Sequence, residues 1–99
     1  MNLQIRWKDC DRSKAVEAGI SDILASLTKY NFITDDAKIE IVHYAKKGIF
    51  KTRINVRVIG KNTIRAEASA PNIYGATNAA LDKIEDQLRR AKTKLIKGR

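Results

Sequence analysis

The sequence predicts an α+β fold of order β-α-β-β-β-α, a four-stranded mixed sheet with two helices packed on one face. Four segments alternate apolar and polar residues with a period of two, which is typical of half-buried strands. Two longer segments repeat apolar residues at spacings of three and four, as one face of a helix does. Two short connecting segments that contain glycine separate the last three strands and indicate hairpins.

The first strand and the first helix follow directly from these patterns. Leu3, Ile5 and Trp7 alternate with polar residues and form the inward face of the strand. Either Asp11 or Ser13 can cap the helix that follows. The apolar face of that helix comprises Val16, Ile20, Ile23, Leu24, Leu27 and Tyr30.

Two details of the first helix lead to expectations. Gly19 costs helix propensity, about 1 kcal/mol relative to alanine, so we expect it to mark close packing on the sheet. The helix should stop near Asn31 and Phe32, because Asp35 and Asp36 are typical turn residues.

The remaining strands are expected at 38–46, 50–58 and 63–70, with hairpin turns at 46–48 and 60–62. A single strand–helix–strand crossover opens the chain, so the first strand should run parallel to the second. Pro71 ends the last strand and Asn72 caps the final helix. A helix over 72–96 is about 37 Å long and should extend past a strand of about 26 Å.

Composition limits the possible classes of protein. The 99 residues suit a single domain, 1–99, with a net charge of +9. No apolar run approaches the roughly 18–20 residues of a membrane span, and no signal peptide is evident, so we expect a cytoplasmic protein without a membrane partner. The single cysteine, Cys10, cannot form an internal disulfide.

The positive charge is concentrated in the second part of the chain. Residues 1–36 hold five basic and six acidic side chains, whereas residues 37–99 hold fifteen basic and five acidic ones. On the outward face of the sheet, where Val42 and Tyr44 also point, only Glu40 and Glu67 oppose eight cations. These cations are Arg6, Lys8, Lys38, Lys46, Lys51, Arg53, Arg57 and Arg65.

The end of the last helix forms a second basic cluster without an acid. It comprises Arg89, Arg90, Lys92, Lys94, Lys97 and Arg99. Such cations can neutralise phosphates, and the scarcity of outward aromatic residues favours recognition of the backbone and shape of folded RNA over base stacking.

No catalytic or metal-binding arrangement is evident, so we expect neither enzymatic activity nor a cofactor. His43 is the only histidine and falls on the inward side of its strand. Asp9 and Asp11 beside Cys10 disfavour a reactive thiolate. The neighbouring carboxylates of Asp35 and Asp36 are better explained by a turn than by a metal site.

The last helix carries a resemblance to a known family. Residues 72–76 and 82–94 are similar to the ribosome hibernation promoting factor and ribosome-associated inhibitor A family, formerly called sigma-factor modulation proteins. Asn72 and Asp86 depart from the family pattern, at a usually acidic cap and a commonly basic position. The matching residues are Tyr74, Ala76, Asp82, Lys83, Gln87, Leu88, Arg90, Lys92 and Lys94.

The resemblance implies a ribosome-binding domain that occupies the messenger and transfer RNA channel of the small subunit. It implies contacts with ribosomal RNA and adjacent ribosomal proteins, and reversible inhibition of translation under stress or in stationary phase. This chain is most similar to the short branch, which is associated with inactive ribosome dimers, with a ribosome modulation factor as a further candidate partner. Away from the ribosome we expect a monomer.

The resemblance assigns RNA contact to Lys83, Arg90, Lys92 and Lys94. The charge pattern adds candidate contacts on the sheet, in the first hairpin turn and on the last helix. These are Arg6, Lys8, Lys46, Lys47, Lys51, Arg53, Arg57, Arg65, Arg89 and Lys97.

Two other classes of function stay open. A general double-stranded RNA-binding module has a similar core, but it usually carries its basic cluster at the beginning of the last helix. A protein-interaction domain, such as a subunit of a transcription regulator, would make the charge incidental. An enzyme that depends on His43 is the weakest alternative.

Overall fold

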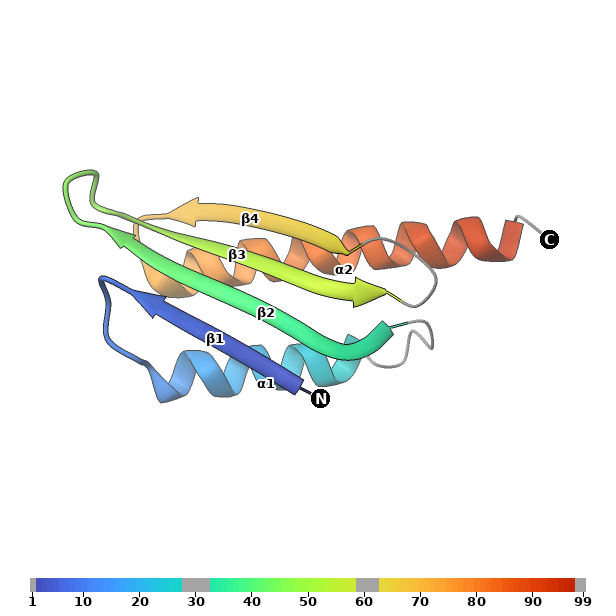
Figure 1. Cartoon of the computed structure of the whole chain (residues 1–99). Helices are drawn as coiled ribbons and strands as arrows, with labels where there is room; N and C mark the ends of the chain where they lie inside the picture. The colour runs from blue at the N-terminus through green and yellow to red at the C-terminus, as the bar shows by residue number, and fades with distance from the viewer. Residues whose placement is uncertain (1, 28–32, 59–62, 98–99) are drawn as a thin grey trace.

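The computed structural model describes residues 2–27, 33–58 and 63–97, with side chains described for 3–25, 36–57 and 63–90. The chain has the predicted β-α-β-β-β-α order (Figure 1). Its elements are β1 (Asn2–Lys8), α1 (Lys14–Leu27), β2 (Ile33–Tyr44), β3 (Ile49–Val58), β4 (Ile64–Ala70) and α2 (Ile73–Lys97).

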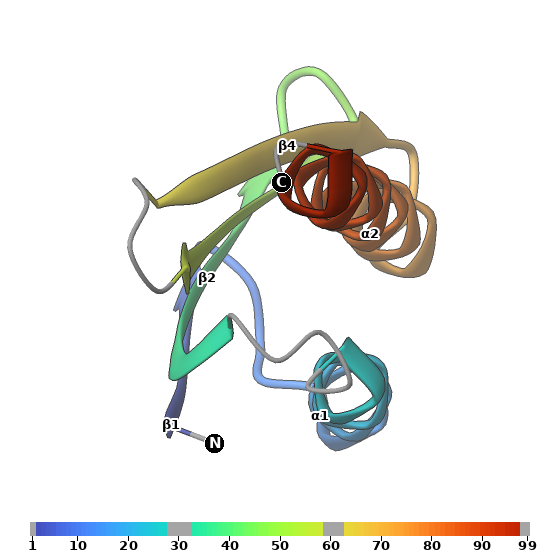
Figure 2. The ribbon, with the colours of Figure 1, turned by 90° about the vertical axis from the view of Figure 1, so that its right-hand side faces the viewer.

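The four strands form one mixed sheet in the order β1-β2-β3-β4. β1 is parallel to β2, whereas β2 with β3 and β3 with β4 are antiparallel. Seen along its length, the twisted sheet has both helices on one side, and the other face is open (Figure 2). The predicted fold class and the predicted parallel pairing are both confirmed.

The core lies between the sheet and the helices. Thr52 of β3 and Thr77 of α2 are buried within it, and their hydroxyls share a hydrogen bond of 3.2 Å, so neither polar group is left unpaired. Burial of each large aliphatic side chain contributes about 1.5–3 kcal/mol. The buried apolar residues that form this core cluster are Val16, Ile20, Leu24, Ala37, Ile39, Ile41, Ile54, Val56, Ala80, Leu81, Ile84 and Leu88.

Both helices begin at a capping side chain. The backbone N–H of Val16 donates to Ser13 Oγ over 3.3 Å, so Ser13 rather than Asp11 caps α1. The N–H of Gly75 donates to Asn72 Oδ1 over 2.7 Å, which confirms the predicted cap of α2. Each contact satisfies a donor that the first helical turn leaves without a partner.

A tight turn joins β2 to β3, as predicted from its lysines and glycine. The N–H of Lys47 donates to the carbonyl of Tyr44 over 3.0 Å, and that of Gly48 donates to Ala45 over 3.2 Å. Gly48 has a φ of 64°, which glycine adopts without steric cost. The second predicted turn, at 60–62, lies outside the described residues.

The beginning of β2 differs from the expectation. Asp35 and Asp36 lie within the strand rather than in a turn, because β2 begins at Ile33. The register with β3 is irregular between Ile33 and Ala37, and the Asp36 carboxylate lies 3.4 Å from the Arg57 guanidinium. Partners on the next strand thus outweigh the local turn preference of aspartate. The predicted helix stop at 31–32 lies outside the described residues.

The expectation for Gly19 is wrong. Its backbone is exposed on α1, and a Cβ atom added there would meet no heavy atom within 4 Å. The glycine therefore does not serve close packing on the sheet. By contrast, the expected excess length of the last helix is visible, because the C-terminal part of α2 extends past the strands (Figure 1).

Candidate nucleic-acid interface

One row of charged residues crosses the open face of the sheet from edge to edge. The strand register places Arg6 of β1, Glu40 of β2, Arg53 of β3 and Glu67 of β4 side by side. We call these four residues the ionic row. Their charges alternate and cancel, so the middle of the face is close to neutral.

Arg53 is the central member of the ionic row. Its Nε lies 3.1 Å from Glu67 Oε2, and its Nη1 lies 3.9 Å from Glu40 Oε1. Arg6 Nη1 is 3.9 Å from the other Glu40 oxygen. Exposed pairs of this kind contribute little to stability, about 0–1 kcal/mol each. Their main effect here is to occupy two cations that were expected to be available for a ligand.

A second row lies next to the ionic row and has a different character. It places Asn55 of β3 between Lys38 of β2 and Arg65 of β4. Neither Lys38 nor Arg65 forms an ion pair with another described residue. We call these three residues the Asn55 row, and its net charge is +2.

On the other side of the ionic row, Lys8, Val42, Lys51 and Ser69 are in register. Val42 lies on the outward face, as expected, but it is only 6% exposed. Its neighbours are two lysines, whose alkyl stems can cover an apolar side chain while their ammonium groups stay in water. The Lys51 ammonium also lies 3.4 Å from a Glu67 oxygen.

The described open face is therefore less positive than predicted. Lys46 lies in the turn after β2, and Asp36 joins the face beside Arg57. Among the described residues, three acids (Asp36, Glu40 and Glu67) oppose seven cations. These cations are Arg6, Lys8, Lys38, Lys51, Arg53, Arg57 and Arg65.

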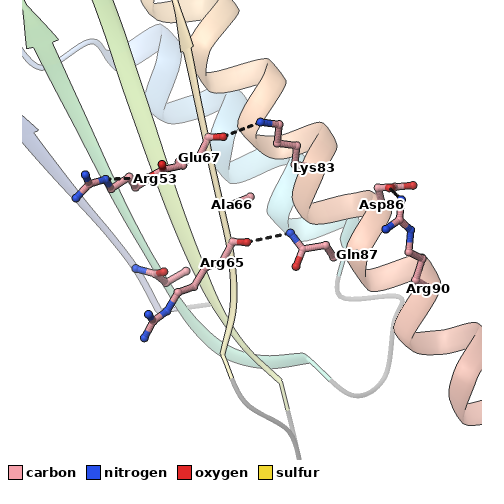
Figure 3. A pocket seen from close by; sticks show the side chains of 9 residues that line it. Arg53, Arg65, Ala66, Glu67, Lys83, Asp86, Gln87 and Arg90 are labelled. Carbon is pink, nitrogen blue, oxygen red and sulfur yellow. Dashed lines mark hydrogen bonds and ion pairs between the residues drawn. The ribbon is translucent and has the colours of Figure 1, made fainter.

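Side chains from α2 bind the outer edge of β4 (Figure 3). Lys83 Nζ donates to the carbonyl oxygen of Glu67 over 2.9 Å, and Gln87 Nε2 donates to that of Arg65 over 2.9 Å. Residues four apart project from the same helical face, and alternate residues of a strand point their carbonyls to the same edge. Lys83, a predicted RNA contact, thus has a structural partner within the protein.

Two of the six cations predicted at the end of α2 have acidic partners. Arg89 Nη2 lies 3.0 Å from Glu85, and Arg90 Nη2 lies 2.7 Å from Asp86. Both acids precede their arginine by one helical turn. The expectation of a cluster without counter-ions is therefore wrong for these two residues. Lys92, Lys94 and Lys97 lie on α2, but their side chains are outside the described part of the chain, as is Arg99.

The far end of the sheet carries the predicted turn cations and two exposed aromatic residues. Lys46 and Lys47 are exposed in the turn between β2 and β3. Tyr44, at the end of β2, is 38% exposed, and Tyr74, in the first turn of α2, is 55% exposed. Only Tyr44 belongs to the sheet, so the described face is not an aromatic platform for base stacking.

The other titratable candidates have structural roles. The His43 ring stacks on Phe50 of the neighbouring strand, with centroids 4.3 Å apart. Burial raises the pKa of the Cys10 thiol, and Asp11 and Asp9 add to the effect. The Cys10 thiol lies 3.6 Å from the carbonyl of Ile41, to which it donates a weak hydrogen bond.

Within the described residues, no group of three or more histidine, cysteine or acidic side chains could hold a metal ion. The described helices include none that is both long and apolar enough to cross a membrane.

Residues 3–96 match the family described as sigma 54 modulation protein / S30EA ribosomal protein. The fold is similar to that of a ribosomal subunit interface protein from Coxiella burnetii, with a TM-score of 0.79 and 23% identity over 95% of this chain and 100% of that chain. It is also similar to the N-terminal domain of Protein Y from Thermus thermophilus, with a TM-score of 0.77 and 24% identity over 91% and 98% of the two chains.

The family match spans nearly the whole chain, and the two solved structures share its fold. The chain therefore belongs to the sigma 54 modulation protein / S30EA ribosomal protein family. Membership confirms the resemblance to ribosome hibernation factors that the last helix indicated. It also places the protein in a ribosome-associated family rather than in a family of enzymes.

Proposed function

We propose that this protein is a ribosome hibernation factor of the cytoplasm. It binds the small ribosomal subunit in the channel for messenger and transfer RNA, and it inhibits translation reversibly by occupying that channel. It acts under stress or in stationary phase and performs no catalysis. The observation that carries the proposal is an open sheet face with an excess of cations in a member of the S30EA ribosomal protein family.

The chemistry of the open face supports an RNA partner. Lysine and arginine side chains that meet phosphates release condensed counterions, which favours binding at low salt. The sheet presents them on a broad surface, next to an α2 that projects past the strands (Figure 1). The name of the Coxiella burnetii relative places that protein at a ribosomal subunit interface, which supports the same kind of location for this one.

A sedimentation assay with purified small subunits tests the proposal. We expect the protein to sediment with the subunits at low salt and to dissociate as salt rises. With six phosphate contacts, affinity should fall about a thousandfold between 50 and 200 mM salt. Messenger RNA and initiator transfer RNA bound beforehand should block the association. Absence of co-sedimentation at low salt would refute the proposal, and binding unaffected by these RNAs would exclude the channel.

We also propose that the protein promotes inactive ribosome dimers. Sucrose gradients of whole ribosomes with the protein, with and without a ribosome modulation factor, should then show a faster-sedimenting species. Comparable affinity for an arbitrary RNA duplex and for small subunits would instead favour a general double-stranded RNA-binding module. Salt-insensitive binding to a protein partner would favour a protein-interaction domain.

A further inference from the structure

Three shallow hollows on the open face and at its β4 edge have Asn55 in common. One lies toward α2, and Arg65 and Gln87 are among its lining residues. Another lies toward β1, and a third lies between Asp36 and Arg65. A short side chain between longer ones leaves a depression, and Asn55 occupies this position between Lys38 and Arg65.

The Asn55 side chain is half-buried and makes no hydrogen bond with another described side chain or backbone group. Its amide offers two N–H donors and a carbonyl acceptor, which are available to solvent or to a ligand. These groups lie where the three hollows meet, and no protein group among the described residues competes for them.

Four cations surround this amide. Lys38 and Arg65 are its cross-strand neighbours, at about 5 Å between Cα atoms, and Arg53 and Arg57 are two residues away on β3, at about 7 Å. Arg53 and Arg57 have acidic partners, whereas Lys38 and Arg65 have none among the described residues. Cations without an ion pair among the described residues therefore flank Asn55 on both neighbouring strands.

We propose that Lys38, Asn55 and Arg65 form a subsite that binds one backbone phosphate of ribosomal RNA. The ammonium and guanidinium groups supply charge-assisted hydrogen bonds, and the Asn55 amide supplies a neutral one between them. The ionic row limits the subsite on one side. This inference rests on the proposed function, because it assumes an RNA partner, and it adds Lys38 and Asn55 to the candidate RNA contacts named from the sequence.

The decisive variant is Asn55→Asp. A carboxylate at this position would lie in register between two cations, so the melting temperature should stay the same or rise. The same carboxylate would repel an incoming phosphate, so affinity for small subunits at low salt should fall at least tenfold. Loss of binding with preserved stability separates a binding role from a structural one.

A second variant removes the two cations, which are on the surface and make no ion pair among the described residues. In Lys38→Gln/Arg65→Gln, the slope of log affinity against log salt should become shallower by about 0.7–0.9 for each phosphate that the protein no longer neutralises. The control is Arg12→Gln/Lys14→Gln, which removes the same formal charge near the start of α1, on the covered side of the sheet, and differs in that Arg12 is paired with Glu17 over 2.7 Å. The control should lower affinity less and leave the slope close to that of the wild type.

The outcomes distinguish the two proposals. If the wild type binds small subunits and both variants bind with the same affinity and slope, the subsite is refuted and the proposed function stands. If the wild type does not bind small subunits at low salt, the proposed function fails and the subsite fails with it. Equal losses in the control and the Lys38→Gln/Arg65→Gln variant would show that total charge, rather than this row, determines binding.

Discussion

Asn72 determines where α2 begins. Its side-chain oxygen accepts a hydrogen bond of 2.7 Å from the N–H of Gly75, and the carbonyl of Asn72 accepts another from Ala76. Gly75 fits this first turn closely, because an added Cβ would lie 3.1 Å from the Cβ of Ala70. The cap and the glycine together place the start of the helix against the end of β4.

Replacing the cap tests this role. We expect Asn72→Ala to lower the free energy of unfolding by about 1 kcal/mol, because a helix-terminal donor loses its partner. Urea denaturation at neutral pH provides the measurement. Asn78→Ala is the control, since Asn78 is exposed within α2 and alanine has the higher helix propensity there. An equal effect of the two substitutions would contradict the capping role.

At the scale of elements, α1 and the turn after β2 each contain a glycine, with opposite requirements. Gly48 has a φ of 64°, a conformation that costs other residues about 1–2 kcal/mol. Gly19 lies within α1 and has open space where a Cβ would be. The turn after β2 therefore requires Gly48 for its backbone conformation. In α1, by contrast, Gly19 only lowers the helix propensity.

Paired substitutions make this contrast measurable. We expect Gly19→Ala to raise the free energy of unfolding by about 0.5–1 kcal/mol. Gly48→Ala should lower it by about 1 kcal/mol, because alanine is strained at this positive φ. Thermal unfolding followed by circular dichroism compares the two variants with the wild type. A destabilising Gly19→Ala would show that the position tolerates no side chain.

At the scale of the whole molecule, acids that neighbour cations reduce the effective charge. The net charge of +9 includes Glu40 and Glu67, which contact cations on the open face, and Glu85 and Asp86, which contact arginines on α2. The availability of each cation therefore depends on its partners as well as on its exposure.

Neutralising the two acids of the ionic row should strengthen RNA binding. In Glu40→Gln/Glu67→Gln, Arg6 and Arg53 lose their carboxylate partners and become available to phosphates. We expect tighter binding to small subunits at low salt and a steeper salt dependence, with a small loss of stability. Equilibrium binding across a salt series is the measurement.

The control for this variant is Glu17→Gln/Asp22→Asn, which makes the same change in charge on α1. It should increase affinity less, because α1 lies on the opposite side of the sheet from the open face (Figure 2). If the affinity for small subunits rises equally in both variants, the location of the acids on the ionic row does not matter.

Most of the fold could be predicted because apolar periodicity reports directly on burial. Alternation identified the strands, and the helical spacing of Ile84 and Leu88 identified the buried face of α2. The start of β2 could not be predicted, because Asp35 and Asp36 have local preferences for turns. Their strand conformation depends on strands that are distant in sequence, because Asp36 is in register with Asn2 of β1 and the flanking Ile33 and Ala37 pair with β3.

The candidate site was only partly predictable for a related reason. Alternation shows which face a residue such as Arg53 occupies, but it does not show which residues of neighbouring strands lie opposite. That information comes from the register of both hairpins, and it reveals the ionic row and the Asn55 row. Asn55 carries no charge, so a count of cations could not single it out.

The contacts of Lys83 and Gln87 with the β4 backbone have a consequence for self-association. An edge strand with unpaired carbonyls is a template onto which another chain can add a strand. Here α2 already occupies the outward carbonyls of Glu67 and Arg65. A neighbouring chain could extend the sheet at these positions only by breaking both hydrogen bonds, so the helix protects this edge from aggregation when the protein accumulates at high concentration.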